Sequence, residues 1–540
     1  MNWCRGRDFL TFSLLDSSKN AQASLTDTVT LEQKCTNYAP DLEQKCTNYA
    51  TDLEQKCTNY APDLEQNYLS QQKYSEIVFE RNANAELEEW ALRANRKPLV
   101  LRGSRQVGKT TLVDNFSKNF DNYLYLNFEK KPGAIALFEK ELEISDLIAE
   151  IFLFCRVDKK SGKTLLFIDE IQHSGIAITK LRYIYEEKIP DLYVIAAGSL
   201  LETMKNKQIS FPVGRVEYLA IRPCMFNEFL RAIGETLLER ALLDLKIPES
   251  LHTRTMNFFN TFTLIGGMPE VIADYAANKN YIGLNRIYET ILTGYRDDVE
   301  KYAKTDTSYQ VIRFILQSGW KFTAERVTLG NFAGSSYKSR EMGEGFRALE
   351  KTFILELCHP TTDVIVPVAK DLKKSPKLLW LDVGLVNYAA KVQKEVFGAS
   401  DIMDAWRGKI AEQIVAQELL ALDSRVSNQR NFWIRNKKDS DAEIDFVIQY
   451  DGKVIPIEVK SGHNAKLFSL HLFMDEVPHD IAIRVWSKPF SIDVVTTREG
   501  KKFRLINLPF YYVGRIEEIL RRVCEETNAQ DLGKTESEPV

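Results

Sequence analysis

The chain has 540 residues, of which 44% are hydrophobic, and its formal net charge is -4. Because a domain usually takes ~100 to 200 residues, we expect three or four well-packed units. The small negative charge excludes a global attraction to nucleic acid, so any DNA contact needs a local basic patch. One candidate patch is Lys370, Lys373, Lys374 and Lys377, with a solvated loop as the alternative.

Cysteine usage and hydropathy indicate the cellular compartment of the protein. The eight cysteines include no C-x-x-C motif and no Cys/His cluster, which argues against a disulfide framework and a zinc site. The apolar stretch at residues 9–15 contains Thr11 and Ser13 and makes a poor signal peptide. No segment approaches the ~20 apolar residues of a membrane span. We therefore expect a cytoplasmic protein with no membrane partner.

Residues 1–72 form an N-terminal extension with tandem repeats. A near-identical 11-residue unit begins at Leu31 and recurs up to residue 66. Its Leu, Cys, Tyr and Ala positions form an apolar helical stripe. However, Pro40 and Pro62 would each interrupt a helix at about 3 kcal/mol. We expect a flexible extension and assign the repeats no chemistry.

A phosphate-binding loop follows the apolar residues 98–101, which are predicted to form a strand. Residues 103–110, with the sequence GSRQVGKT, fit G-x-x-x-x-G-K-[ST] at every fixed position. Glycines allow the tight turn that directs backbone N–H groups at phosphate oxygens, and the following helix presents its positive end. Lys109 is expected to contact the β- and γ-phosphates of ATP, and Thr110 to hold Mg²⁺. The expected nucleotide contacts are Gly103, Ser104, Arg105, Gln106, Val107, Gly108, Lys109, Thr110 and Thr111.

Strands are predicted at residues 123–128, 164–168 and 192–197. The second ends in two acids, which indicates ATP hydrolysis. Asp169 would bind Mg²⁺ through its second shell, and Glu170 would orient and deprotonate the attacking water. Ordinary charge at a strand end is the alternative.

Two further candidates follow the last of these strands. Ser199 is placed to sense the γ-phosphate, although an ordinary turn is an alternative there. Arg215 is a candidate arginine finger, which would stabilise transition-state charge in its own site or a neighbouring subunit's site. A surface ion pair is the alternative for Arg215.

The middle of the chain has a helical pattern. Residues 309–316, 329–333 and 340–349 surround a glycine turn and predict a helix-turn-helix or winged-helix unit. Such units bind proteins as well as DNA. The basic candidates for phosphate contacts are Lys338, Arg340 and Arg347.

A β-hairpin is predicted around the Asp451-Gly452 turn. The two-residue turn sets Asp445 opposite Glu458, and Glu443 opposite Lys460. Carboxylates ~5 Å apart repel by roughly 1 kcal/mol in water-like surroundings, and a divalent cation removes that repulsion.

With Glu412 from a preceding helix, Asp445, Glu458 and Lys460 form the D…E-x-K pattern of restriction-type nucleases. In that pattern the acids hold Mg²⁺ and the lysine aids the attacking water. The alternative is a fold that was kept after catalysis was lost, with Lys460 neutralising the acids. Pro456 in the return strand indicates an edge or bulged strand.

The motifs together resemble a known family, the bacterial and archaeal AAA+ type ATPases that carry a C-terminal domain of unknown function with a nuclease-like fold. The resemblance covers roughly residues 73–515 and rests on residues 101–111, 166–172, 197–199, 214–218, 266–270 and 380–385. It implies an AAA+ fold and favours Arg215 as a finger. Ser199 departs from the Asn that many relatives of the wider class carry.

We therefore expect an α/β protein. The expected parts are an extension (1–72), an AAA+ P-loop ATPase with a parallel sheet (73–240), a helical lid and winged-helix-like region (241–395), a restriction-endonuclease-like α/β domain (396–524) and a disordered polar tail (525–540). ATP and Mg²⁺ are the expected ligands, and DNA, a protein partner or a second copy of the chain are candidate partners. Two functions stay open: an ATPase that gates a nuclease acting on DNA, and an ATP-driven switch or adaptor with an inactive nuclease-like domain.

Overall fold

The computed structural model describes residues 79–198, 214–303, 305–392, 404–437, 441–461 and 467–535. The chain divides into the units Met1–Glu76 and Ile77–Val540, and all described residues belong to the second. The N-terminal repeats and Ser199 lie outside the described residues. In the described part, no helix has the length and apolar character needed to cross a membrane.

Five parallel strands form the first sheet, in the order β2-β3-β4-β1-β5. The strands are β1 (Leu99–Arg102), β2 (Asn122–Asn127), β3 (Thr164–Asp169), β4 (Leu192–Ala197) and β5 (Glu217–Ala220). The first four match the predicted strands. The pattern did not predict β5, which begins with the charged Glu217 rather than with an apolar run. β4 lies between β1 and β3, so one strand separates the strand before the phosphate loop from the strand that ends in Asp169.

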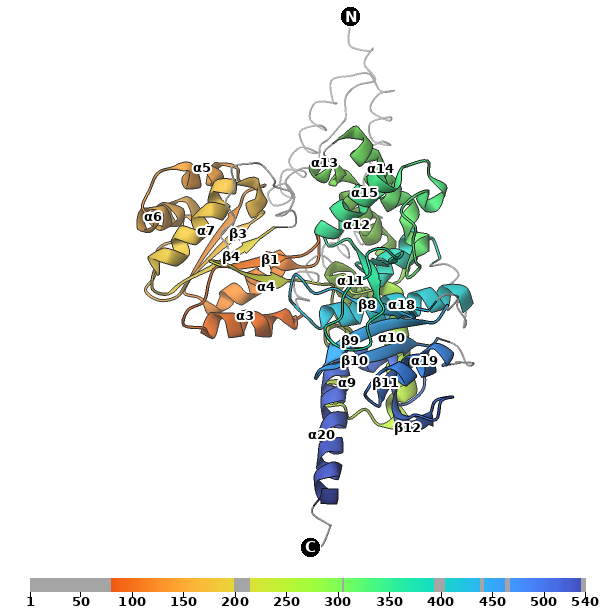
Figure 1. The fold of residues 1–540 in the computed structure, drawn as a ribbon. Coiled ribbons are helices and arrows are strands. Elements are labelled where there is room, and N and C mark those ends of the chain that lie inside the picture. Colours follow the sequence, from red (N-terminus) through yellow and green to blue (C-terminus); the bar gives the residue numbers. More distant parts are fainter. Residues whose placement is uncertain are drawn as a thin grey trace, which may run out of the picture. The chain divides into compact units, whose positions relative to one another are not determined.

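Helices cover both faces of this sheet (Figure 1). One face carries α3 (Ala83–Leu92) and α4 (Lys109–Phe116), and the other carries α5 (Gly133–Glu139), α6 (Ile144–Cys155) and α7 (Gly175–Glu187). Leu165 and Phe167 of β3 enter the first core, whereas Leu166 and Ile168 enter the second. A strand buried on both faces reads as a continuous apolar run, which is why this sheet was predictable.

A helical region follows the first sheet. Its helices are α8 (Phe226–Ala232), α9 (Thr236–Leu243), α10 (His252–Ile265), α11 (Pro269–Asn278), α12 (Asn285–Asp297), α13 (Val299–Tyr302), α14 (Asp306–Ser318), α15 (Ser339–Lys351) and α16 (Val383–Ala389). α14 and α15 are the helices expected at residues 309–316 and 340–349. The helix expected at residues 329–333 is instead a single 3₁₀ turn at Phe332–Gly334, in which Ala333 has φ 53°. A left-handed residue cannot continue a helix.

The second sheet has eight strands in the order β12-β13-β11-β10-β9-β8-β6-β7. They are β6 (Leu355–Thr361), β7 (Lys377–Trp380), β8 (Asn431–Ile434), β9 (Glu443–Tyr450), β10 (Lys453–Val459), β11 (Ile481–Trp486), β12 (Ser491–Thr496) and β13 (Lys502–Pro509), accompanied by the helices α18 (Asp404–Ala421), α19 (Phe468–Glu476) and α20 (Ile516–Thr535). β6 and β7 precede residue 396. The second sheet therefore contains strands from both sides of the domain boundary that the sequence predicted between residues 395 and 396.

Two expectations about this region are wrong. β10 is neither an edge strand nor bulged at Pro456, because it pairs with β9 in unbroken register and also with β11. Pro456 has no N–H to donate, and the sheet accommodates it because the pairing of β10 with β11 begins only at the next residue, Ile457. The tail from residue 525 is helical as far as Thr535, because α20 continues there from a first half in which Leu520 and Val523 are buried.

Candidate functional site

The phosphate loop lies between β1 and α4. Gly103 has φ 152°, and a Cβ at this position would stand 2.3 Å from the carbonyl oxygen of Ile221. Gly108 has φ 89° and begins α4 in a left-handed conformation. Both positions therefore require glycine. A left-handed residue directly before a helix helps to direct backbone N–H groups toward an anion.

Lys109 points back into the loop. Its buried Nζ donates hydrogen bonds to the carbonyls of Gly103 (2.9 Å) and Ser104 (2.7 Å). Burial lowers the pKa of Lys109 to about 8, and the nearby carboxylates of Glu170 and Asp169 oppose that shift. A bound triphosphate would place negative charge beside this buried ammonium and would favour its charged form.

Asp169, at the end of β3, receives three side-chain hydrogen bonds on Oδ2. Thr110 Oγ1 donates over 3.0 Å, Tyr125 Oη over 3.3 Å and Asn127 Nδ2 over 3.2 Å. Hydroxyl and carboxylate oxygens are ligands that Mg²⁺ takes, so Thr110 and Asp169 fit such an ion. Sequence reasoning missed Tyr125 and Asn127. The available signal was that β2 ends in a polar residue, which lies opposite Asp169 in the sheet.

Glu170 follows with φ 54°, a left-handed conformation that is unfavourable for a residue with a Cβ. Its N–H donates to Asp169 Oδ1 over 3.1 Å, and its Oε2 accepts a hydrogen bond from Gln172 Nε2. The first contact fixes the backbone of Glu170 and the second holds its carboxylate, whose charge acts on Lys109. The structure thus brings together Lys109, Thr110, Asp169 and Glu170.

Arg105 connects the loop to the helical region. Its Nε lies 2.6 Å from Asp298 Oδ2, and its Nη2 lies 3.6 Å from Glu129 Oε1. Lys301 Nζ pairs with the same two acids, at 3.2 Å and 3.3 Å. The four charges link the phosphate loop to the segment after β2 and to the junction of α12 and α13.

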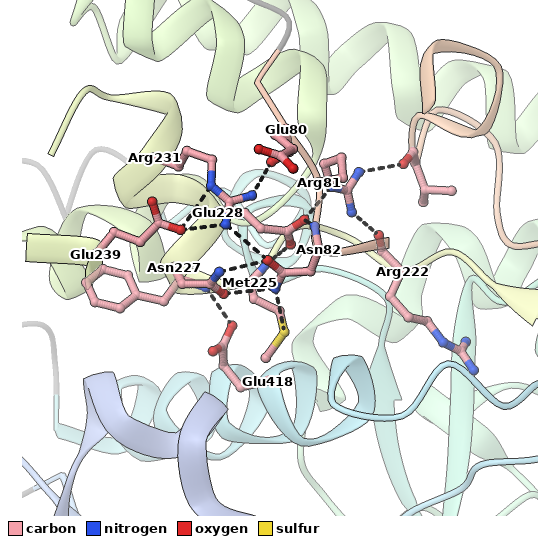
Figure 2. Close-up of polar contacts among 12 residues, drawn as sticks. Glu80, Arg81, Asn82, Arg222, Met225, Asn227, Glu228, Arg231, Glu239 and Glu418 are labelled. Carbon is pink, nitrogen blue, oxygen red and sulfur yellow. Dashed lines mark hydrogen bonds and ion pairs between the residues drawn. The ribbon is translucent and has the colours of Figure 1, made fainter. Parts of the chain in front are cut away.

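Arg81 also supports the loop, and sequence reasoning missed it. Arg81 Nη1 donates to the carbonyl of Val107 (3.1 Å), Nη2 donates to the carbonyl of Arg222 (2.8 Å), and Nε lies 2.7 Å from Glu228 Oε1 (Figure 2). Pro269, the first residue of α11, lies on another side, with its Cγ 3.4 Å from the position of a Cβ on Gly108. The loop is therefore enclosed by residues far from it in the sequence.

Two of the motifs that carry the family resemblance meet at Asp382. Its Oδ2 accepts the N–H of Gly267 (2.5 Å), and its Oδ1 accepts the N–H of Leu385 (3.0 Å). Burial raises the pKa of Asp382 to about 6, and these backbone hydrogen bonds oppose the shift. The carbonyl of Gly267 in turn accepts the N–H of Cys224 over 2.7 Å. Asp382 therefore ties the segment after β5 to the start of α16.

Arg215 forms an ion pair at the surface. Its Nε lies 3.1 Å from Glu186 Oε1 on α7, and 42% of its side chain is exposed. This contact is the alternative that the sequence left open for Arg215. A role as an arginine finger, in its own site or in a neighbouring subunit's site, stays a prediction.

In the second sheet, Lys377 occupies the centre of the predicted nuclease-like site. Its Nζ lies 3.0 Å from Glu412 Oε2, 2.8 Å from Glu443 Oε1 and 3.5 Å from Asp445 Oδ1, and 3% of its side chain is exposed. Burial by itself would lower the pKa of Lys377, but the three carboxylates outweigh it and raise the pKa well above the usual value. Lys377 is therefore part neither of an exposed basic patch nor of a solvated loop, and both interpretations were wrong for this residue. Lys373 and Lys374 are exposed.

The other predicted residues of this site lie around the same point. Lys460 Nζ lies 2.6 Å from Glu458 Oε1, and Asp445 Oδ2 accepts the N–H of Val459 over 2.7 Å. Burial and the charge of Asp445 raise the pKa of Glu458 to about 8 and that of Glu412 to about 7. The structure thus brings Glu412, Asp445, Glu458 and Lys460 together around Lys377, and their role as a nuclease site stays a prediction. Among the described residues, no group of three or more His, Cys, Asp or Glu is arranged to hold a metal ion.

Comparison with protein families covers most of these parts. Residues 95–230 match the family model described as an AAA domain. This segment is an AAA-type ATPase-like domain. Residues 256–396 match the domain of unknown function DUF8612, and residues 407–504 match the domain of unknown function DUF4143. No curated protein sequence matches the chain significantly.

Solved structures show distant likeness. The Walker-type ATPase PABY2304 of Pyrococcus abyssi is 14% identical, with 58% of this chain and 96% of that chain covered and a TM-score of 0.37. The RuvB Holliday junction branch migration motor of Thermotoga maritima is 14% identical, with coverage of 55% and 93% and a TM-score of 0.25. The ORC1 protein of Aeropyrum pernix in complex with DNA is 15% identical, with coverage of 58% and 93% and a TM-score of 0.25. Because these three scores lie below 0.5, we infer nothing further from them.

Proposed function

We propose that the AAA domain binds and hydrolyses ATP and that the rest of the chain responds as a switch. The observation that carries this proposal is the contact of Thr110 with Asp169 beside Lys109 and Glu170. A hydroxyl, a lysine and two acids at the mouth of a phosphate loop are the parts that phosphoryl transfer to water requires.

Each residue then has one role. The loop amides and Lys109 hold the triphosphate, which draws Nζ away from the carbonyls of Gly103 and Ser104. Thr110 and Asp169 hold Mg²⁺, which neutralises charge on the phosphates when it is bound. Glu170 orients the attacking water and accepts its proton. Arg215 of a neighbouring copy is the candidate finger in a homo-oligomer.

The switch is proposed to act through the contacts that surround the loop. Arg105 is bound to Asp298, and Arg81 is bound to Val107 and Glu228. A shift of the loop on ATP binding therefore changes contacts to α8 and to the junction of α12 and α13. Gly267 and Asp382 extend this connection to α16.

For the C-terminal part we favour the adaptor form, in which the nuclease-like domain and the winged-helix-like pair α14 and α15 bind a protein partner. The supporting observation is Lys377, whose ammonium already contacts three of the carboxylates near which a metal would bind. The second candidate is an Mg²⁺-dependent nuclease that acts on DNA under ATP control. It is favoured by the convergence of Asp445, Glu458 and Lys460.

ATP turnover and DNA cleavage, measured together with purified protein, separate these functions. We expect wild type to hydrolyse ATP in Mg²⁺ at a rate that DNA does not change, and to leave DNA intact in Mg²⁺ and in Mn²⁺. The Asp445→Ala variant should turn over ATP at the wild-type rate. Cleavage by wild type that is lost in Asp445→Ala would establish the nuclease instead, and absence of ATP turnover would refute the ATPase itself.

A further inference from the structure

A cavity of about 320 Å³ lies where the AAA domain meets the second sheet. One wall residue, Arg222, follows β5. The other walls come from the end of α15, from β6 and β7, and from the segment between α18 and β8. The residues that matter for its chemistry are Arg222, Arg347, Lys351, Phe353, Trp380 and Arg430. Four basic and two acidic side chains line it, a formal excess of two positive charges. A volume of this size is at the lower end of small-molecule sites.

Arg222 is a buried cation that forms no ion pair with any described residue. It is 8% exposed, and within the described part of the chain its buried Nε has no hydrogen-bond partner. Figure 2 shows that its side chain points away from the network in which its carbonyl accepts from Arg81. Its guanidinium instead stands 4.8 Å from the ring centre of Phe353. Burial and the charge of Arg430 lower the pKa of Arg222 to about 10, although arginine keeps its proton at neutral pH.

The two acids of the cavity are already engaged. Glu356 Oε2 lies 2.8 Å from Arg430 Nη2, so this acid balances Arg430. Glu350 Oε1 accepts the N–H of Leu357 over 2.8 Å, and burial raises the pKa of Glu350. Neither acid makes an ion pair with Arg222 among the described residues. Glu356 and Asp423 act on Arg222 from a distance and oppose the fall in its pKa, but neither forms an ion pair with it. Burial of a charge without an ion pair is unfavourable by several kcal/mol, and an anion in the cavity would relieve that cost.

Trp380 lines the same cavity and adds an aromatic surface to its wall. Its Nε1, like Arg222 Nε, is buried and finds no hydrogen-bond partner among the residues that the structure describes. A guanidinium without an ion pair, in a wall of net positive charge, calls for a ligand that carries acceptors and negative charge. The guanidinium fork matches the oxygens of a phosphate group, and a phosphate dianion equals the charge excess of the wall. The volume exceeds that of a bare phosphate ion and leaves room for an organic group beside Phe353 and the aliphatic wall.

We propose that this cavity binds a phosphate monoester, with the phosphate on Arg222 and with Arg347 and Lys351 at the entrance. Inorganic phosphate carries the same group and is the alternative ligand for this site.

The site is connected to the phosphate loop by adjacent residues. Arg102, which also lies over Phe353 at 5.4 Å, directly precedes Gly103. The N–H of Ile221, which precedes Arg222, donates to the carbonyl of Arg102 over 2.6 Å. A ligand on Arg222 therefore acts on the backbone that supports Gly103. Binding in the cavity does not depend on ATP hydrolysis, whereas any effect on turnover rests on the proposed ATPase.

Calorimetric titration of the full chain tests the site directly. All proteins carry Lys109→Ala, so that the phosphate loop contributes little to anion binding. The probes are ribose 5-phosphate, inorganic phosphate and ribose. We expect ribose 5-phosphate to bind at least tenfold more tightly than ribose, and added Arg222→Met to weaken it at least tenfold. Tighter binding of ribose 5-phosphate than of inorganic phosphate supports the monoester, whereas equal binding assigns the site to the free ion and overturns that part of the proposal.

Matched variants keep the test independent of folding. Arg254→Met, at an exposed position of α10, should leave the affinity unchanged. Arg347→Ala, at the entrance, should weaken binding about two- to fivefold without changing the melting temperature. Arg222→Met itself should melt no lower than its parent, because it removes an unpaired buried charge. Equal affinity in the Arg222→Met variant, or no binding of either phosphate at millimolar concentration, would overturn the proposal.

Discussion

Replacing Lys377 with methionine should strongly destabilise the second sheet. Methionine keeps most of the volume but removes the ammonium that Glu412, Glu443 and Asp445 surround at 2.8 to 3.5 Å. Removal of one partner from a buried ion pair typically costs about 3–5 kcal/mol, because the remaining charges stay buried and unpaired. For a region of this size we expect the melting temperature to fall by roughly 6–20 °C.

The loss should depend on pH. The pKa of Glu412 is already raised to about 7 with Lys377 present, and the ammonium is one of the groups that hold it down. In Lys377→Met the acids therefore take up protons more readily, and protonation removes their repulsion. Arg326 lies 3.7 Å from Glu443, at the edge of the cluster, and does not replace the lysine. The variant should thus lose more stability at pH 8 than at pH 5.5.

The assay is thermal unfolding of the full chain at pH 5.5 and pH 8, with Lys373→Met as the control. Lys373 is exposed in the same segment and should have no effect. Glu412→Gln should restore part of the stability of Lys377→Met. A fall of less than 2 °C at pH 8, or an equal fall at both pH values, would refute this account of the charge balance. Restoration by Mn²⁺ would show that the freed acids take a metal.

The remaining predictions concern the loop and the wild-type pH dependence. Gly103→Ala should lower the affinity for ATP at least tenfold in equilibrium binding, because its Cβ would stand 2.3 Å from the Ile221 oxygen. Gly133→Ala, which has open space around it, is the control. Unchanged affinity in Gly103→Ala would contradict the geometry. Arg81→Met should lower the stability of the chain by about 3–5 kcal/mol, because Glu228 is left buried and unpaired, and denaturation that matches wild type would contradict this. The folded-state pKa values of Glu412 and Glu458 are raised above their usual values, so these acids stabilise the fold at low pH, and that contribution is lost as pH rises through about 7 and 8. Wild type should therefore unfold at a higher temperature at pH 5.5 than at pH 8, and the difference should shrink in Glu412→Gln.

The parts that the sequence predicted are those whose geometry is local. The phosphate loop, the acids at the end of β3 and the register of β9 with β10 each follow from residues within one turn or one strand pair. A two-residue turn leaves one register, so the position of the Asp451-Gly452 turn is enough to set Asp445 opposite Glu458.

The parts that were missed depend on contacts between distant segments. Lys377 reaches the acids only because β6 and β7 join the edge of the second sheet, which no local pattern reveals. Arg81, Asp298 and Pro269 reach the phosphate loop from helices and from a segment before β1. Because Lys377 follows other lysines closely in the sequence, a solvated loop was one interpretation of the segment. The burial of Lys377 contradicts that interpretation.

The measurement that tests the central claim most directly is phosphate release from ATP in Mg²⁺ by wild type and by Glu170→Gln, with nucleotide binding measured on the same samples. Glutamine keeps the contact with Gln172 and the size of the side chain but cannot accept the proton of water. We predict that Glu170→Gln binds ATP as tightly as wild type and releases phosphate at least 100-fold more slowly. Equal phosphate release by the two proteins would contradict the assigned role of Glu170, and failure of wild type to bind ATP would contradict the nucleotide site as a whole.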